Sequence, residues 1–94
     1  MLKEYYDSDT KILSIPYDFN KKLKNIPLDT EIILFKGNSK EYYSRFDQKI
    51  EVGDLPPNVR QITFGSKFNQ PVDNLPPNLT HLTFGKSFNK LVKN

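Results

Sequence analysis

The final part of the chain contains one pattern written twice, as LPPNVRQITFGSKFNQPVDN from Leu55 to Asn74 and as LPPNLTHLTFGKSFNKLVKN from Leu75 to Asn94. Both copies begin with Leu-Pro-Pro-Asn, and both place Thr-Phe-Gly and Phe-Asn at the same distance from that start. A tandem repeat with a fixed short period is typical of architectures in which successive units stack on one another. This repeat therefore decides the fold before any single element is assigned.

The first copy predicts one short strand and an irregular return path. Ile62 and Phe64 alternate with polar neighbours, which is the two-residue period of a strand. We therefore expect a strand over residues 60–64, ended by a turn at Gly65. The two prolines at 56–57 fix φ and lack amide donors, so the stretch before the strand is extended or turning. No part of the unit leaves room for a full helix.

A weaker form of the same pattern begins at Thr10. Aligning Phe19 with Phe68 places Leu13 and Ile15 where the later unit has Ile62 and Phe64. The predicted single domain of residues 1–94 then consists of an N-terminal cap and four repeat units, numbered one to four along the chain. The cap covers residues 1–9, and the units cover residues 10–25, 26–54, 55–74 and 75–94.

A single unit of this kind cannot bury its large apolar side chains, whereas a stack of units can. Pairing of equivalent strands in parallel, about 4.8 Å apart, would place Phe64 over Phe84 and Ile62 over Leu82. The predicted fold class is mainly β: a short right-handed solenoid of about four coils with one parallel sheet and no full helices.

The Phe-Asn pair of each unit predicts an internal ladder. We expect the four phenylalanines to form one buried column, one ring per coil. The amide or carboxylate beside each ring would then bond backbone groups of its own and the next coil, because the return path has no sheet partners. The predicted ladder residues are Phe19, Phe46, Phe68 and Phe88, followed by Asn20, Asp47, Asn69 and Asn89.

The stretches LPPNLTHLTFGKSFN and FNQPV resemble FNIP repeats, a family of slime moulds and of large DNA viruses of amoebae that is similar to leucine-rich repeats. The two clear copies cover residues 55–94, with units slightly shorter than is usual in the family. The last copy reads Asn-Lys-Leu-Val at 89–92 in place of Asn-Gln-Pro-Ile/Val. The resemblance implies a protein partner, host-derived if the source is viral. Family members often carry an F-box that recruits ubiquitin ligases, and we expect no F-box in this chain.

Composition argues against catalysis. The 94 residues include no cysteine and one histidine, and the net charge is +3. Without cysteine there is neither a disulfide framework nor a Cys-ligated zinc, and the composition suits a reducing compartment such as the cytoplasm, or the host cytoplasm of a viral protein. A lone His81 makes neither a metal site nor a catalytic triad. No apolar run is long enough to cross a membrane. We therefore expect a non-enzymatic protein without cofactor, metal or membrane span.

Two features predict a surface for a protein partner. Unit two is longer than the later units, and its inserted stretch GNSKEYYSR at 37–45 places tyrosines beside an arginine, which is the composition of interaction hot spots. A tyrosine packed against the side of the solenoid is the alternative reading. Outward-facing strand positions form the second feature, with two aliphatic side chains in unit two. The predicted partner-binding residues are Ile32, Leu34, Tyr42, Tyr43, Arg45, Gln61, Thr63, His81 and Thr83.

Two alternative functions stay open at this point. The sequence stops at Asn94 without a capping segment, so the last coil would present a strand edge and an apolar layer to a second copy. The predicted self-association residues of such a homodimer are Leu79, Leu82, Phe84, Phe88 and Leu91. The second alternative is weak nucleic-acid binding through lysines such as those at 21–24. Interspersed acids and scarce arginines favour a solvated surface over this reading.

Overall fold

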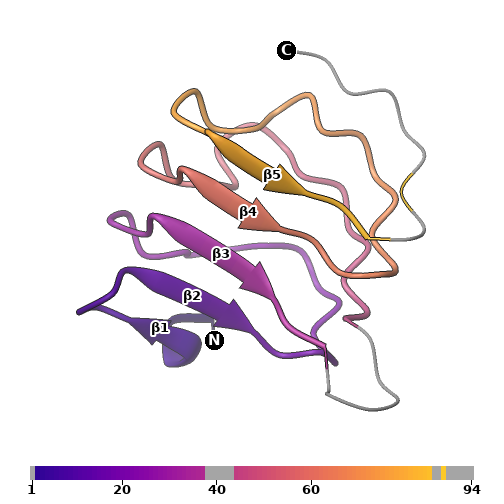
Figure 1. Ribbon diagram of the computed structural model, residues 1–94, viewed down its shortest axis with the longest axis horizontal. Coiled ribbons are helices and arrows are strands. Elements are labelled where there is room, and N and C mark those ends of the chain that lie inside the picture. Colours follow the sequence, from indigo (N-terminus) through magenta and orange to yellow (C-terminus); the bar gives the residue numbers. More distant parts are fainter. Residues whose placement is uncertain (1, 38–43, 86–87, 89–94) are drawn as a thin grey trace.

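One sheet of five strands organises the chain in the computed structural model, which describes residues 2–37, 44–85 and 88. The described residues are mainly strand and loop, and they contain no full-length helix (Figure 1). The strands lie in the sheet in the order of the sequence. The elements are the 3-10 helix η1 (Leu2–Tyr5) and the strands β1 (Tyr6–Asp7), β2 (Ile12–Ile15), β3 (Ile32–Phe35), β4 (Gln61–Thr63) and β5 (His81–Thr83).

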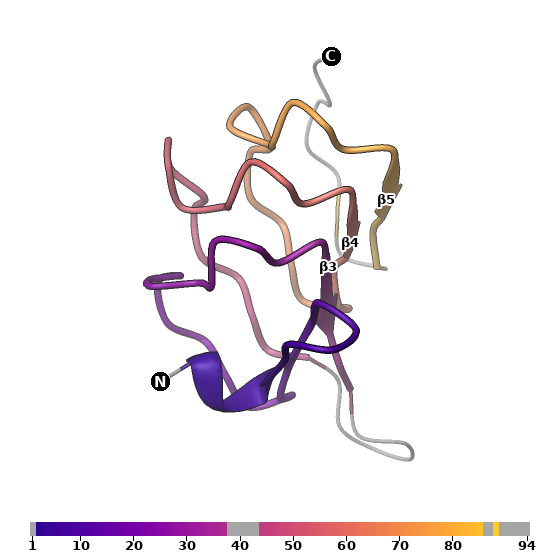
Figure 2. The ribbon, with the colours of Figure 1, turned by 90° about the vertical axis from the view of Figure 1, so that its left-hand side faces the viewer.

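Strands β2 to β5 are parallel, and their register follows the repeat. Leu13 lies opposite Ile33, Ile33 opposite Ile62, and Ile62 opposite Leu82. Leu13, Ile33 and Ile62 are fully buried, because alternation along a strand sends every second side chain to the same face. Figure 2 shows the return segments of the chain on that one side of the sheet.

The expectation of a purely parallel sheet is wrong at its first edge. β1 pairs with β2 in antiparallel fashion, with Tyr6 opposite Leu13, so the sheet is mixed. The physical reason is the short connection, since a parallel pair needs a crossover of about a dozen residues or more. The Lys11 N–H donates to the Asp7 carbonyl at 2.8 Å, and Lys11 adopts a φ of 61°. A tight turn of this kind reverses the chain direction.

The core repeats from unit to unit with one polar exception. Unit two has Thr30 where unit three has Val59, and both side chains are fully buried. The Thr30 hydroxyl donates to the Pro27 carbonyl at 2.7 Å, so the buried oxygen is satisfied. The Thr30 N–H donates to the same carbonyl at 3.1 Å, and the Val59 N–H donates to Pro56 at 3.3 Å. These equivalent turns place each following strand.

Glycine allows the units to approach closely beside the strand ends. A Cβ atom added at Gly65 would lie 2.2 Å from the Cβ of the buried Ser44. A Cβ atom added at Gly85 would lie 2.5 Å from the Gly65 carbonyl oxygen. Both distances are shorter than any real contact, so the Gly at this repeat position is a packing requirement between neighbouring units.

Candidate functional site

The outward face of the sheet carries six of the predicted partner-binding residues in two rows. One row joins Ile32, Gln61 and His81, which lie opposite one another along β3, β4 and β5. The second row occupies the next outward position of the same strands and consists of Leu34, Thr63 and Thr83. In both rows the side chains of β3 and β4 are half-buried, and those of β5 are exposed.

The apolar part of this face continues into β2. Ile12 lies opposite Ile32 and is also half-buried. Ser14 lies opposite Leu34 and continues the second row. Ile12, Ile32 and Leu34 therefore form an aliphatic patch at one end of the face, defined here as the sheet patch, and polar side chains of β4 and β5 border it.

The predicted residues of the insertion are only partly placed. Arg45 is exposed. Its backbone N–H donates to the Tyr17 carbonyl at 2.8 Å, and this bond fixes the end of the insertion to unit one. Tyr42 and Tyr43 lie outside the described residues.

A side-chain hydrogen bond positions the ring of His81 at the start of β5. The Thr80 hydroxyl donates to the Arg60 carbonyl at 3.0 Å, and its oxygen lies 3.0 Å from the His81 Nδ1. The contact between the Thr80 hydroxyl and Nδ1 ties the His81 ring to its neighbour in the chain.

A column of nearly parallel rings connects the four units. The centroid distances are 6.2 Å from Phe19 to Phe46, 5.9 Å from Phe46 to Phe68, and 6.2 Å from Phe68 to Phe88. Phe46 and Phe68 are fully buried, whereas the rings at the two ends are half-buried. Stacked aromatic pairs at such distances add to the stability gained from burial alone.

A polar ladder runs beside the rings, and it has a direction. The Asp47 N–H donates to the Asn20 Oδ1 at 2.9 Å, and the Asn69 N–H donates to the Asp47 Oδ1 at the same distance. Each rung therefore donates backwards, to the side-chain oxygen of the preceding unit. Because only that oxygen is used, aspartate at 47 serves as well as asparagine. Asn89 lies outside the described residues.

Sequence reasoning missed the second donor of each rung. The Gln48 Nε2 lies 2.9 Å from the Asn20 Oδ1, and the Gln70 Nε2 lies 2.9 Å from the Asp47 Oδ1. The Gln48 Nε2 also donates to the Asn20 backbone carbonyl, and the Gln70 Nε2 donates to the Asp47 backbone carbonyl, each at 3.2 Å. Glutamine after Phe-Asn or Phe-Asp was the signal that could have identified these bonds.

The predicted self-association residues lie at the far end of the stack. Leu79, Leu82, Phe84 and Phe88 are half-buried. Their counterparts in unit three are buried. Among the described residues no strand pairs with the outer edge of β5. Leu91 lies outside the described residues.

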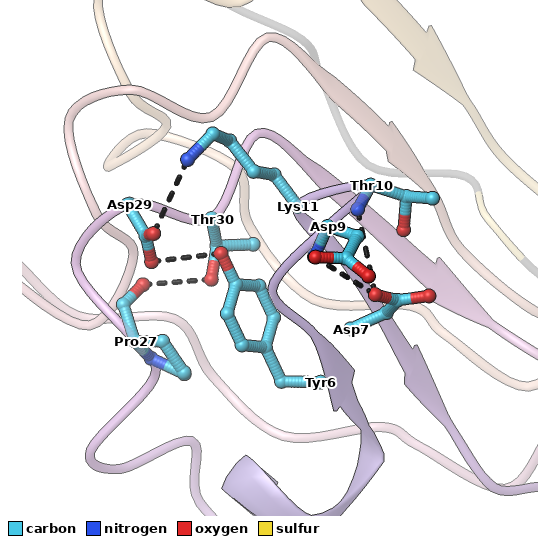
Figure 3. Close-up of polar contacts among 8 residues, drawn as sticks. All are labelled: Tyr6, Asp7, Asp9, Thr10, Lys11, Pro27, Asp29 and Thr30. Atoms are coloured by element: carbon cyan, nitrogen blue, oxygen red, sulfur yellow. Dashed lines mark hydrogen bonds and ion pairs between the residues drawn. The ribbon is translucent and has the colours of Figure 1, made fainter.

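A polar cluster that the sequence did not predict ties the N-terminal cap to unit two (Figure 3). The Tyr6 hydroxyl donates to the Asp29 Oδ1 at 2.7 Å, and the Lys11 Nζ lies 3.3 Å from the Asp29 Oδ2. Desolvation, together with the bond to the Asp29 carboxylate, raises the pKa of Tyr6 to about 12. The same hydrogen bond, and then Lys11, lower the pKa of Asp29 below its usual value.

One member of the basic cluster at 21–24 is neutralised by acids of unit two. The Lys22 Nζ lies 2.6 Å from the Asp54 Oδ2 and 2.9 Å from the Glu51 Oε1. Hydrogen bonds to Asp54 and then Glu51 raise the pKa of Lys22. This pairing reduces the positive charge that the cluster could offer to a phosphate backbone.

Neither a metal cluster nor a membrane span is found in the part of the chain that the structure describes. No three His, Asp or Glu side chains there come together as metal ligands. None of the helices there has the length and hydrophobicity needed to cross a bilayer.

The parallel strands, the ring column and the directional ladder define a mainly-β repeat protein. Comparison with protein-family models matches the FNIP Repeat family at residues 46–74 and 71–94, which together make up more than half of the chain. The chain belongs to this family. A search of curated proteins gave no match, and a search of solved structures gave none either.

Proposed function

We propose that the chain is a right-handed solenoid of four coils that acts as a non-enzymatic protein-interaction module, with the sheet patch at the centre of its binding surface. The observation that carries the proposal is the half-exposed aliphatic cluster of Ile12, Ile32 and Leu34 on the outward sheet face. An apolar patch bordered by polar side chains is typical of protein interaction sites.

The nature of the sheet supports this proposal. Parallel sheets are as a rule covered on both faces. Here the return segments lie on one side only, and the other side carries no layer among the described residues (Figure 2). A rigid strand surface also loses little conformational entropy when a partner docks. A bound protein would supply the missing layer.

The test replaces the sheet patch and a matched set of exposed aliphatic residues. Ile32→Ser with Leu34→Ser should abolish capture of a partner from the native cytoplasm. Leu28→Ser with Val52→Ser is the control, because these side chains are 78% and 84% exposed and lie on turns outside the strands. Equal capture by both double variants and the wild type would contradict the proposal.

Self-association is the second candidate, and the half-buried end of the stack favours it. Leu79, Leu82, Phe84 and Phe88 would gain cover from a two-fold copy. Sedimentation velocity should detect a dimer that survives the change of Ile32 and Leu34 to serine. A strict monomer at high micromolar concentration would exclude this candidate.

Two further proposals concern the setting of the protein. The absence of cysteine supports a reducing compartment, the cytoplasm. Weak nucleic-acid binding would rest on lysines other than Lys22, which is paired with acids. Binding of random DNA should then be strongest at low salt. No retention there would remove nucleic acid as a partner.

A further inference from the structure

The phenylalanine column ends at a cavity beside the N-terminal cap. This cavity has a volume of about 430 Å³. Leu2 and Tyr5 of η1 contribute to its lining, together with Phe19, Asn20 and Lys21 of unit one. Phe19 stacks on Phe46 on the side of unit two and is only half-buried, unlike the two interior rings. The cavity therefore lies where the ring and the rung of a preceding unit would stand.

The polar ladder leaves a donor unused at this end. In units two and three, the N–H beside the ring donates to the side-chain oxygen of the preceding unit, as from Asp47 to Asn20. Asn20 belongs to the first rung, and its N–H has no acceptor among residues 2–37, 44–85 and 88. Because donors run towards the N-terminus throughout the ladder, the vacant place calls for an acceptor.

The charge at the same place selects the kind of acceptor. Gln48 and Gln70 supply the second donor of the interior rungs, and Lys21 occupies the equivalent position of the first rung. Lys21 and Lys24 both line the cavity, and neither forms an ion pair with a described residue, although Asp18 also contributes a negative charge. An ammonium group makes a stronger hydrogen bond to a carboxylate than to a neutral amide.

We propose that this cavity binds an extended peptide segment in which an aromatic residue is followed by aspartate. The aromatic ring stacks on the open face of Phe19, in the manner of Phe46 on the other side. The aspartate carboxylate accepts the Asn20 N–H and the Lys21 ammonium, and so completes the first rung. This site is separate from the sheet patch and stands whether or not that patch binds a partner.

A short segment fits this end better than a second copy of the chain. β1 pairs with β2 along the edge of the sheet, in the place that the strand of a preceding unit would take. A second copy therefore cannot continue the sheet in register. A few extended residues, by contrast, can reach Phe19 and Asn20, where the ring column and the polar ladder begin. Self-association at this end is accordingly an outcome of the test that contradicts the proposal.

The first experiment titrates the full chain, labelled with ¹⁵N, with a peptide that contains Phe-Asp between glycines. Two control peptides contain Phe-Ala and Ala-Asp in the same frame. Saturable binding is expected, with the largest shifts at the amides of Asn20 and Lys21. Each control should bind at least about tenfold more weakly, because a charge-assisted hydrogen bond or a stacked ring is lost. Absence of saturation, equal binding of the controls, or shifts confined to β3–β5 would overturn the proposal.

The second experiment uses variants that leave the core untouched. Lys21→Gln keeps an amide donor like those of Gln48 and Gln70 but removes the charge. The wild type should bind a Phe-Asp peptide more tightly than a Phe-Asn peptide, because the ammonium bonds more strongly to a carboxylate. Lys21→Gln should weaken Phe-Asp binding by about tenfold, abolish this preference, and reduce the salt dependence. Lys67→Gln is the control, since Lys67 is exposed just before Phe68 and away from the cavity. An equal loss of peptide affinity in both variants, or no loss in either, would refute the assignment. Peptide binding that occurs only at protein concentrations where the chain self-associates would refute it as well.

Discussion

The backbone N–H of Asp47 donates to the Oδ1 of Asn20 at 2.9 Å, across 27 positions of the chain. This bond links two return segments that share no strand ladder. Its repetition from Asn69 to Asp47 shows that polar groups, as well as stacked rings, hold neighbouring units in register.

The Asp47 side chain should matter as an acceptor rather than as a charge. Asp47→Ala leaves the Asn69 N–H and the Gln70 amide without their shared oxygen, and we expect a loss of about 1–3 kcal/mol in the free energy of unfolding. Asp47→Asn keeps the oxygen and should be nearly neutral. Urea unfolding measures both. Equal stability of the alanine variant and the wild type would show that the ladder contributes nothing.

Phe68, inside the ring column, should contribute more to the free energy of unfolding than Phe88 at its end. Phe68 is fully buried, whereas Phe88 is half-buried. Phe68→Ala should cost about 3–5 kcal/mol or prevent folding, since large cavities in cores have this effect. Phe88→Ala should cost clearly less. Circular dichroism and urea titration of the two variants provide the comparison, and a reversed order would contradict the stacked arrangement.

Gly65 should be required for close contact, in contrast to Gly53. Gly65→Ala places a methyl group 2.2 Å from the Ser44 Cβ and should be strongly destabilising. Gly53→Ala meets no atom within 4 Å and should lose only about 1–2 kcal/mol, from its φ of +85°.

A double variant tests the Gly65 contact directly. Ser44→Gly removes the atoms nearest to the added methyl group, so the double variant should be more stable than the sum of the single effects predicts. Strict additivity in thermal unfolding would place the strain elsewhere.

The cap cluster should make stability depend on pH at both extremes. The raised pKa of Tyr6 means that its contribution is present below pH 10 and is lost as pH rises towards about 12. The lowered pKa of Asp29 means that its contribution is present above pH 3.8 and is lost as pH falls through the folded-state pKa.

Tyr6→Phe is the variant that tests the pH dependence. Its melting temperature should be lower than that of the wild type at neutral pH, and the difference should shrink at both ends of the range. Tyr5→Phe is the control, because Tyr5 is 44% exposed beside the cluster residue. A difference between Tyr6→Phe and wild type that does not change with pH would exclude the Tyr6–Asp29 bond as its source.

The repeated part of the structure could be predicted because each unit carries the same local signals. Alternation around Ile62 located the strand, and the spacing of Phe-Asn located the ring column, so registers such as Ile33 to Ile62 followed from the alignment of units. The resemblance to FNIP repeats indicated the same stacked units for residues 55–94, and the family match extends from residue 46 to residue 94.

The unrepeated contacts could not be predicted. The turn that ends in the positive φ of Lys11 makes β1 antiparallel, and the Asp7 carboxylate accepts the Asp9 N–H within it. Asp-Ser-Asp at 7–9 indicates a turn but does not specify which strand β1 pairs with. Pairs such as Tyr6 with Asp29 join residues that occur once and lie far apart in the chain. The direction of the ladder was also hidden, because asparagine can both donate and accept.

Hydrogen exchange of three equivalent amides tests the ladder most directly. The N–H groups of Asp47 and Asn69 are bonded to the preceding unit, and that of Asn20 has no acceptor among the described residues. Nuclear magnetic resonance at neutral pH should therefore find slow exchange at Asp47 and Asn69 and fast exchange at Asn20. Equally fast exchange at all three amides would contradict the ladder, and slow exchange at Asn20 alone would contradict its direction.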